Sequence, residues 1–76
     1  MQKYRDTDRA SGVDSYEISE VAIKIKFKNN HIVYVYTYTK PGQLHVEKMK
    51  KLASVGDGLN AYINTKVKSN FERIEY

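Results

Sequence analysis

A chain of 76 residues is long enough for one small domain with a single hydrophobic core, but too short for a deep cleft between two lobes. Hydrophobic residues make up 41% of it and aromatic residues 12%, a composition that argues for a folded globule and against disorder. The absence of cysteine excludes a disulfide framework and a thiolate metal site, and it fits a reducing compartment.

The net charge of +4 is unevenly distributed along the chain. Residues 1–20 carry three basic and five acidic side chains, residues 21–51 carry seven basic and one acidic, and residues 52–76 carry three of each. A localised basic stripe over residues 21–51 would attract polyanions. Lysines on exposed strands also prevent edge-to-edge pairing, so the charge pattern leaves both interpretations open.

Nothing in the chain indicates a membrane partner. No apolar run approaches the roughly 18 residues of a spanning helix, and the first ten residues lack the apolar region of a signal peptide. We therefore expect a cytoplasmic protein with no membrane partner.

The N-terminal half predicts an arm followed by a β-hairpin. Residues 1–14 are rich in Asp, Arg, Ser and Thr without an apolar period, which predicts a flexible N-terminal arm. A single domain would then span residues 15–76. Alternation begins at Ser15, with Ile18 isolated among polar residues, either as a short strand or as a lead into the hairpin. The two strands of the hairpin are predicted at about Val21–Lys28 and Ile32–Thr39, whose apolar residues recur at every second position.

After Pro41 and Gly42 the apolar period changes from 2 to about 3.6. This predicts a helix over Gln43–Val55 with Gly56 as its C-terminal stop. Asp57 would then cap a second helix. The apolar stripe of that helix comprises Leu59, Tyr62, Ile63, Val67, Phe71 and Ile74. The fold class is therefore α+β: an N-terminal antiparallel hairpin of two or three strands, followed by two short helices packed on one sheet face.

The register of the hairpin decides which face its tyrosines occupy. With a two-residue turn, Ile25 lies opposite Tyr34, and the tyrosines share the apolar face. With one more residue in the turn, Ile25 lies opposite Val35, and the tyrosines share the face of the lysines. Core volume slightly favours the first register, because valine and threonine alone would fill little space. The sequence leaves both registers open.

These two registers lead to two functional hypotheses. A face that combined lysines and tyrosines would bind RNA or single-stranded nucleic acid, with lysines on phosphates and tyrosine rings stacked on bases. The alternative is a protein-interaction or structural module that uses the sheet edge or face, as a monomer or weak dimer. The candidate nucleic-acid-binding residues are Lys24, Lys26, Lys28, Tyr34, Tyr36, Tyr38, Lys48, Lys50 and Lys51.

Other polar residues do not assemble into a catalytic or metal site. His31 and His45 lack partners at ligand spacing, so we expect no metal and no cofactor. Ser54 lacks a base and an orienting acid, and its expected role is to satisfy helix-end backbone groups. Asn60 is expected either to hydrogen-bond into the turn at residues 54–57 or to face a ligand. We therefore expect no enzymatic activity.

Several short motifs follow one another along the chain. Their residues are Ser15, Ile18, Val21, the strand Ile-Lys-Ile-Lys-Phe, Tyr34, Tyr36, Tyr38, Ala53, Ser54, Gly56, Asn60 and Ile63. In this order they resemble the KTSC domain, a short bacterial domain found at the C-terminus of some lysyl-tRNA synthetases and as a free-standing protein. That family has a central Tyr-x-Tyr and an Ala-Ser-x-Gly-x-Tyr-Phe-Asn-x-x-Ile segment. Here Leu59 stands in place of the Phe and Gly58 in place of the Tyr.

The resemblance covers residues 15–71 and implies a small non-enzymatic domain without an established biochemical function. RNA binding has been suggested for the family because of its attachment to a tRNA synthetase, which is an argument by association. Ser54, Gly56, Asp57 and Asn60 would form its structural motif around the turn between the two helices.

Overall fold

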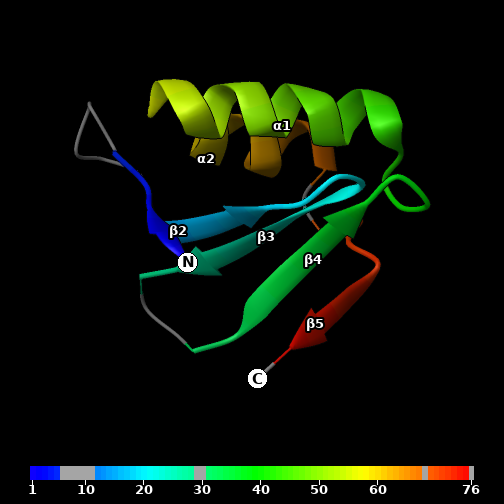
Figure 1. Cartoon of the computed structure of the whole chain (residues 1–76), viewed down its shortest axis with the longest axis horizontal. Coiled ribbons are helices and arrows are strands. Elements are labelled where there is room, and N and C mark those ends of the chain that lie inside the picture. The colour runs from blue at the N-terminus through cyan, green and yellow to red at the C-terminus, as the bar shows by residue number, and fades with distance from the viewer. Residues whose placement is uncertain (6–11, 29–30, 68, 76) are drawn as a thin grey trace.

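The computed structural model describes residues 1–5, 12–28, 31–67 and 69–75. Within these ranges the chain forms an antiparallel sheet of five strands in the order β1-β2-β3-β4-β5, with its helices on one face, which confirms the predicted α+β class (Figure 1). The strands are β1 (Gln2–Lys3), β2 (Val13–Ile18), β3 (Ala22–Phe27), β4 (Val33–Thr37) and β5 (Arg73–Glu75), and the helices are α1 (Gln43–Val55), α2 (Leu59–Tyr62) and the π-helix η1 (Ile63–Val67).

The central hairpin has the register in which Ile25 lies opposite Tyr34. Lys26 then pairs with Val33, so the lysines and the tyrosines point to opposite faces of the sheet. The register that core volume slightly favoured is confirmed. The turn residues 29–30 lie outside the described part of the chain.

The hydrophobic core lies between the sheet and the helices. Residues from β3 and β4 pack here against one stripe of α1, whose amphipathic pattern gives it a single apolar face. Full burial of one Val, Ile, Leu or Met side chain contributes about 1.5–3 kcal/mol to the free energy of unfolding. The residues of this core are Tyr4, Val13, Tyr16, Ile23, Ile25, Tyr36, Val46, Met49, Ala53, Leu59, Ile63 and Val67.

Helix α1 has the predicted bounds and the predicted end. Gly56 follows it with a φ of 82°, a left-handed conformation that glycine adopts at low steric cost. Its N–H donates to the Leu52 carbonyl at 2.9 Å, which satisfies one of the last carbonyls of the helix.

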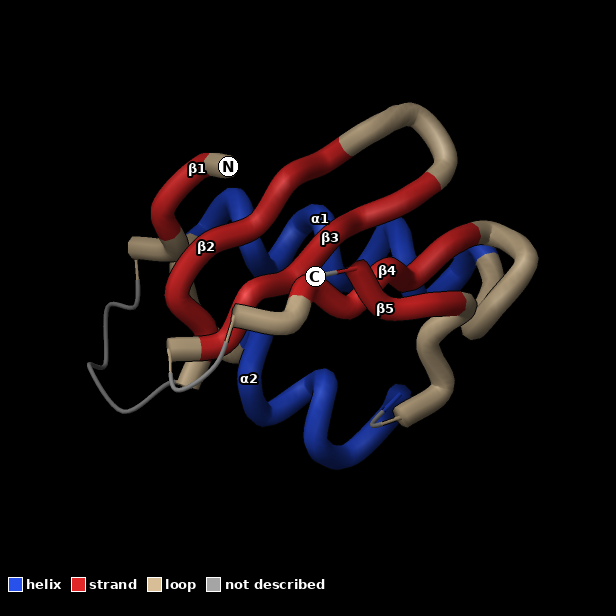
Figure 2. Tube along the Cα trace, turned by 90° about the horizontal axis from the view of Figure 1, so that it is seen from below, coloured by secondary structure: helices blue, strands red, loops and turns tan. Residues whose placement is uncertain are grey.

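The opposite face of the sheet is not covered by a helix. Figure 2 shows this face toward the viewer, with α1 behind the strands. Antiparallel sheets commonly have one face in the core and one in solvent, as here. None of the described helices is long and apolar enough to cross a membrane.

The prediction of an N-terminal arm is wrong for the described residues of that segment. Residues 2–3 pair with β2, and the Tyr4 side chain is buried in the core. Val13 and Asp14 belong to β2 itself. A single tyrosine among polar residues gives no periodic signal, although its burial is enough to hold the segment on the sheet. Residues 6–11 of the predicted arm lie outside the described part of the chain.

The second helix is shorter than predicted. Helix α2 continues into the π-helix η1 only as far as Val67, so Phe71 and Ile74 are not helical. Instead, Ile74 lies in β5, opposite Tyr34. The spacing of three to four positions between apolar residues continues by coincidence beyond the end of the helix, to Phe71 and to Ile74 in the strand.

The prediction that Asp57 caps the second helix is also wrong. The N-cap position is held by Gly58 in a left-handed conformation, and the Asp57 side chain makes no capping hydrogen bond. The first N–H of the helix, from Leu59, donates to the Tyr4 hydroxyl at 3.2 Å. An aromatic side chain from the N-terminal segment therefore bonds to the start of this helix.

Candidate binding groove

Lys24 and Lys26 lie on the uncovered face of the sheet, next to acidic side chains. Lys24 Nζ is 3.1 Å from Glu75 Oε1, and Lys26 Nζ is 3.9 Å from Asp14 Oδ2. Arg73 adds a further pair with Glu75 at 3.4 Å. Exposed ion pairs of this kind contribute about 0–1 kcal/mol each. They nevertheless balance the charge of this face, which does not form the continuous basic stripe that the sequence suggested.

The three tyrosines of the second hairpin strand lie in three different environments. Tyr36 is only 1% exposed, and Tyr34 and Tyr38 are half-buried. Burial raises the pKa of Tyr36 to about 12, and the adjacent Tyr34 adds to this effect. Because Tyr36 belongs to the core, no base can stack on it while the domain is folded. A combined lysine and tyrosine face on the hairpin is therefore absent.

Tyr38 contacts α1 rather than a free surface. Its hydroxyl donates to Glu47, and Lys50 donates to the same carboxylate at 2.8 Å. The Lys50 ammonium also lies 5.3 Å from the centre of the Tyr38 ring, within the range of a cation–π contact. The hydrogen bond to Glu47 raises the pKa of Tyr38, and the hydrogen bond from Lys50 lowers the pKa of Glu47. This cluster joins the end of β4 to α1.

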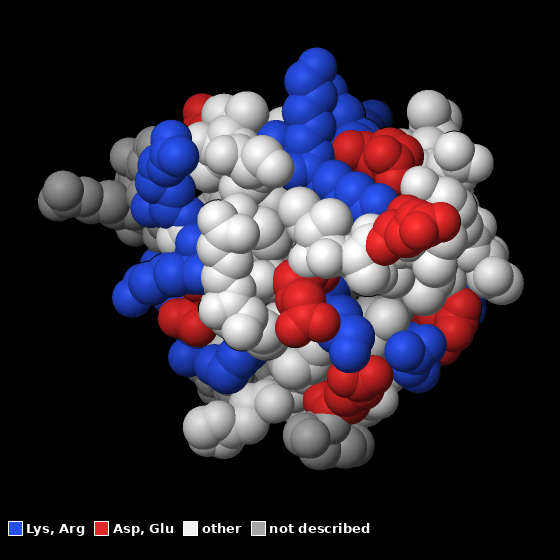
Figure 3. Space-filling model, in the orientation of Figure 1, with Lys and Arg blue, Asp and Glu red and all other residues white. Residues whose placement is uncertain are grey.

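The remaining predicted lysines are also dispersed. Lys48 and Lys51 are exposed on α1, whereas Lys28 directly follows β3. Figure 3 shows Lys and Arg side chains along the left edge of the molecule, the end where β3 ends and β2 begins in Figure 1. Acidic side chains are interspersed over much of the same view. A second group of basic side chains lies at the top centre of the same view.

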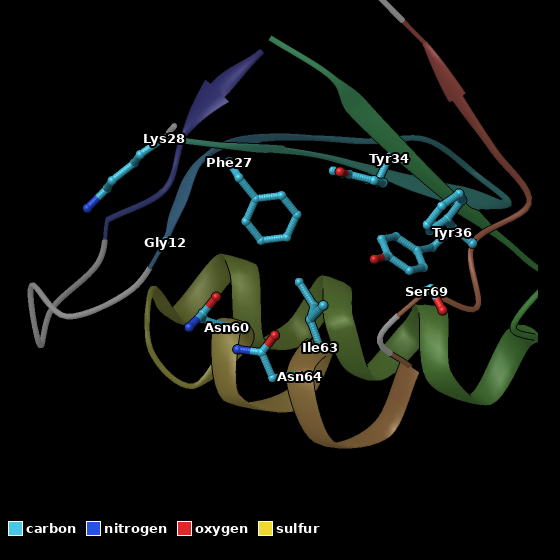
Figure 4. Close-up of a pocket in the computed structure, with 10 residues that line it drawn as sticks. Gly12, Phe27, Lys28, Tyr34, Tyr36, Asn60, Ile63, Asn64 and Ser69 are labelled. Atoms are coloured by element: carbon cyan, nitrogen blue, oxygen red, sulfur yellow. The ribbon is translucent and has the colours of Figure 1, made fainter. Parts of the chain in front are cut away.

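A groove opens between the sheet and the α2–η1 segment. It lies on the same side of the sheet as the helices, which cover that side only in part. Its volume is about 680 Å³, within the range of sites that bind small molecules or single chemical groups of a larger ligand. Strands β3 and β4 form one side, and α2 with η1 forms the other (Figure 4). The lining residues are Gly12, Phe27, Lys28, Tyr34, Tyr36, Asn60, Ile63, Asn64, Ser69 and Phe71.

The sheet side of this groove is a chain of aromatic rings. The Phe27 and Tyr34 ring centres are 5.4 Å apart at an interplanar angle of 70°, and those of Tyr34 and Phe71 are 5.0 Å apart at 60°. Tyr36 forms the buried end of the chain, with its ring 6.1 Å from that of Phe71. T-shaped and tilted contacts between these rings hold them in fixed positions along the groove.

The side chains that the described part of the helices directs into the groove are polar and uncharged apart from Ile63, which is apolar. Asn60 lies on α2 and Asn64 on η1, and Figure 4 shows both amides directed toward the cavity, across from Phe27. Neither amide makes a hydrogen bond within the described part of the chain. The π-helical turn that holds Asn64 is a conformation often found next to functional sites.

The rim of the groove is formed where β3 ends. The Lys28 N–H donates to the Gly12 carbonyl at 2.8 Å, which fixes these two segments side by side. The Lys28 side chain is exposed and extends away from the cavity (Figure 4). Gly12 lies close to Asn60, whose Oδ1 would be 3.6 Å from a Cβ at this position. A chain-like ligand that filled the groove would therefore pass next to Lys28 where it leaves the groove.

Other polar residues that the sequence singled out have structural partners. His45 Nδ1 lies 2.8 Å from the Tyr62 hydroxyl, and His31 is exposed. The Ser54 hydroxyl donates to the Lys50 carbonyl at 3.0 Å, one turn earlier in α1, rather than to the last carbonyls of the helix. Among the described residues, no three His, Cys, Asp or Glu side chains come together as metal ligands do.

Several groove residues were not candidates from the sequence. Phe71 was predicted to be helical, and neither Asn64 nor Ser69 was predicted to have a functional role. A signal for Asn64 was present, since Asn60 and Asn64 are four positions apart and therefore share a helix face. The alternative in which Asn60 faces a ligand is the one compatible with its place in the groove.

Comparisons of the chain with protein-family models, with curated proteins and with solved structures found no match. The resemblance to the KTSC domain therefore stays a prediction. Four of the residues that carry it, Tyr34, Tyr36, Asn60 and Ile63, line the groove together.

Proposed function

We propose that this protein is a small non-enzymatic domain that binds RNA or single-stranded nucleic acid, with an unpaired base in the aromatic groove. The observation that supports this is the combination of a half-buried ring, Tyr34, with two uncharged amides and a rim cation in one cavity. Every base offers a flat π-face to an aromatic ring and polar edges to amides.

The groove accounts for nucleic-acid binding without the hairpin face on which the sequence hypothesis depended. Tyr34 supplies the stacking surface, and Lys28 lies where the phosphate backbone would leave the cavity. The net charge of +4 supplies long-range attraction for a polyanion. Lys24 and Lys26, on the other face, have no direct role in this arrangement.

The competing hypothesis, a protein partner that adds a strand to the sheet, has less support. The two edges of the sheet are β1, with two residues, and β5, with three. Such short edges offer few main-chain hydrogen bonds to an added strand.

Binding of fluorescently labelled single-stranded RNA to the full chain, followed by anisotropy, tests the proposal. We expect the affinity to fall steeply between about 50 mM and about 200 mM salt, because phosphate contacts release counterions. Tyr34→Ala should cost about 1–3 kcal/mol of binding free energy, the value of one base–aromatic stack. Tyr34→Phe, which keeps the ring, is the matched control and should bind nearly as well as the original chain.

Circular dichroism and urea unfolding establish that each variant is folded under the binding conditions. Absent binding, or binding that a folded Tyr34→Ala variant retains in full, would refute the proposal. Saturable binding of an unstructured peptide at the same groove, with none of RNA, would favour the protein-partner hypothesis.

A further inference from the structure

The polar groups of the groove differ from those of a general phosphate-binding surface. Of the ten described residues that line it, Lys28 alone is charged, and its ammonium extends away from the cavity. The other polar side chains among these lining residues are neutral: those of Asn60, which is half-buried, and of Asn64 and Ser69, which are exposed, besides the tyrosine hydroxyls. A phosphate is therefore poorly matched to the interior, whereas a neutral, flat group with polar edges is well matched.

Asn60 and Asn64 present the same chemistry from adjacent turns of the helix. Each amide offers an N–H donor and a carbonyl acceptor side by side. Both are directed toward the space beside Phe27 and Tyr34, and neither bonds to another group within the described residues (Figure 4). A ring held against the aromatic wall would therefore meet a donor and an acceptor along one edge.

Among the bases, adenine fits this donor and acceptor pair best. Its exocyclic N6 amine and its N7 form the bidentate pairing typical of asparagine, whereas guanine is most often read by Arg or Lys and cytosine by Asp or Glu. The lining residues that the structure describes include neither a carboxylate nor a guanidinium. A purine also offers a larger stacking surface than a pyrimidine to the wall of Phe27 and Tyr34.

We infer that the groove selects an unpaired adenine, whose N6 and N7 are contacted by the amides of Asn60 and Asn64. This inference rests on the proposed function, because it names the base that the nucleic acid places in the groove. It also assigns to Asn60 and Asn64 a role in base preference rather than in affinity for the backbone.

Four oligonucleotides of equal length test the inference. One is an all-uridine RNA, and the other three carry at the central position adenosine, purine riboside, which lacks the N6 amine, or 7-deazaadenosine, which lacks N7. We expect central adenosine to bind about tenfold more tightly than uridine. Each analogue should lose most of that gain, because each lacks one of the two contacted atoms.

Variants of the amides separate base preference from general binding. Asn60→Asp and Asn64→Asp keep the side-chain size but replace the amide donor by an acceptor. The added negative charge should weaken all four oligonucleotides, so the ratio of adenosine to uridine affinity is the informative quantity, and we expect it to fall toward one. Lys28→Gln is the matched control, since it should weaken all four alike and leave that ratio unchanged.

The outcomes distinguish this inference from the proposed function. Salt-dependent binding with equal affinity for adenosine and uridine would refute adenine selection and leave RNA binding standing. A preference for cytidine or guanosine, measured in the same oligonucleotide frame, would also refute adenine selection. If none of the oligonucleotides binds to the folded chain, both the inference and the proposed function are wrong.

Discussion

Tyr34 lies directly opposite Ile25 in the β3–β4 pair. Because side chains alternate along a strand, this pairing places Tyr34 and Tyr36 on the face toward the helices. Tyr36 is enclosed in the core, whereas Tyr34 lies at the groove, with its ring 5.4 Å from that of Phe27. Two residues of the same type, two positions apart, therefore have different roles, and their variants should behave differently.

Alanine at these two positions should separate folding from binding. We expect Tyr36→Ala to cost about 3–5 kcal/mol, the usual loss for a large buried aromatic side chain. A domain of this size has a total stability of about 4–11 kcal/mol, so this variant should be largely unfolded or close to it. Tyr34 is half-buried, and Tyr34→Ala should cost clearly less. Urea unfolding of both variants measures the difference, and equal losses would contradict the assignment of Tyr36 to the core.

The buried phenol of Tyr36 should make stability depend on pH in the alkaline range. Its pKa of about 12 in the folded chain exceeds the ordinary value of 10.0. The folded state therefore holds the proton more tightly, and this contribution is complete below pH 10 and lost as the pH rises from 10 toward 12. Within that window the loss should approach about 1.4 kcal/mol per pH unit.

The measurement combines urea unfolding at a series of pH values with the ultraviolet absorbance of phenolate. Tyr36→Phe should flatten the pH dependence and remove one late-titrating tyrosine. Tyr38 also has a raised pKa, through its hydrogen bond to Glu47, so Tyr38→Phe is the second control and should leave the Tyr36 titration in place. A Tyr36→Phe variant with the pH profile of the original chain would show that another group is responsible.

The sequence predicted those parts of the fold whose signal is local and periodic. The alternation of β3 and β4 and the helical stripe of α1 each come from one face that must be buried, so the pattern alone identifies the element. The register was open because it changes when the turn is longer by one residue, and the alternating pattern of the strands does not report the length of the turn. Strand β5 shows the limit, since Ile74 fits both a helical spacing and a three-residue strand.

The candidate site was less predictable than the fold. Its described residues come from five separate segments, around Gly12, Phe27, Tyr34, Asn60 and Phe71, that only the folded topology brings together. Tyr4 illustrates the same limit, because its contact with the Leu59 N–H joins positions 55 residues apart in the sequence. Tertiary contacts of this kind leave no periodic trace in a single sequence.

Alanine at two glycines should report on the attachment of the N-terminal segment. Gly56 has a φ of 82°, and a Cβ there would lie 2.4 Å from the Cβ of Arg5, so Arg5 must shift. The left-handed conformation alone costs a non-glycine residue about 1–2 kcal/mol. We therefore expect Gly56→Ala to lower the free energy of unfolding by at least that amount and to loosen the pairing of β1, which hydrogen exchange would detect.

Gly12→Ala is the matched control. Its Cβ would make an ordinary contact, 3.6 Å from Asn60 Oδ1, and we expect the free energy of unfolding to change by no more than about 0.5 kcal/mol. If Gly56→Ala is as stable as Gly12→Ala, the packing of Arg5 against the end of α1 is not part of the folded state.

Lysine variants on the two faces of the sheet should locate the bound nucleic acid. Lys28 follows β3 at the rim of the groove, whereas Lys24 and Lys26 lie on the opposite face beside Glu75 and Asp14. If the backbone passes the rim, Lys28→Gln should weaken RNA binding and reduce the slope of log K against log salt by about 0.7, the value for one phosphate contact on a single strand. The double variant Lys24→Gln/Lys26→Gln removes twice the charge, yet we expect it to change that slope less.

Anisotropy titrations at several salt concentrations measure both slopes. Long-range attraction depends on the sum of the charges, whereas the salt slope counts the phosphates in contact. A larger change of slope in the double variant than in Lys28→Gln would therefore place the nucleic acid on the uncovered face and leave the groove without a role in binding.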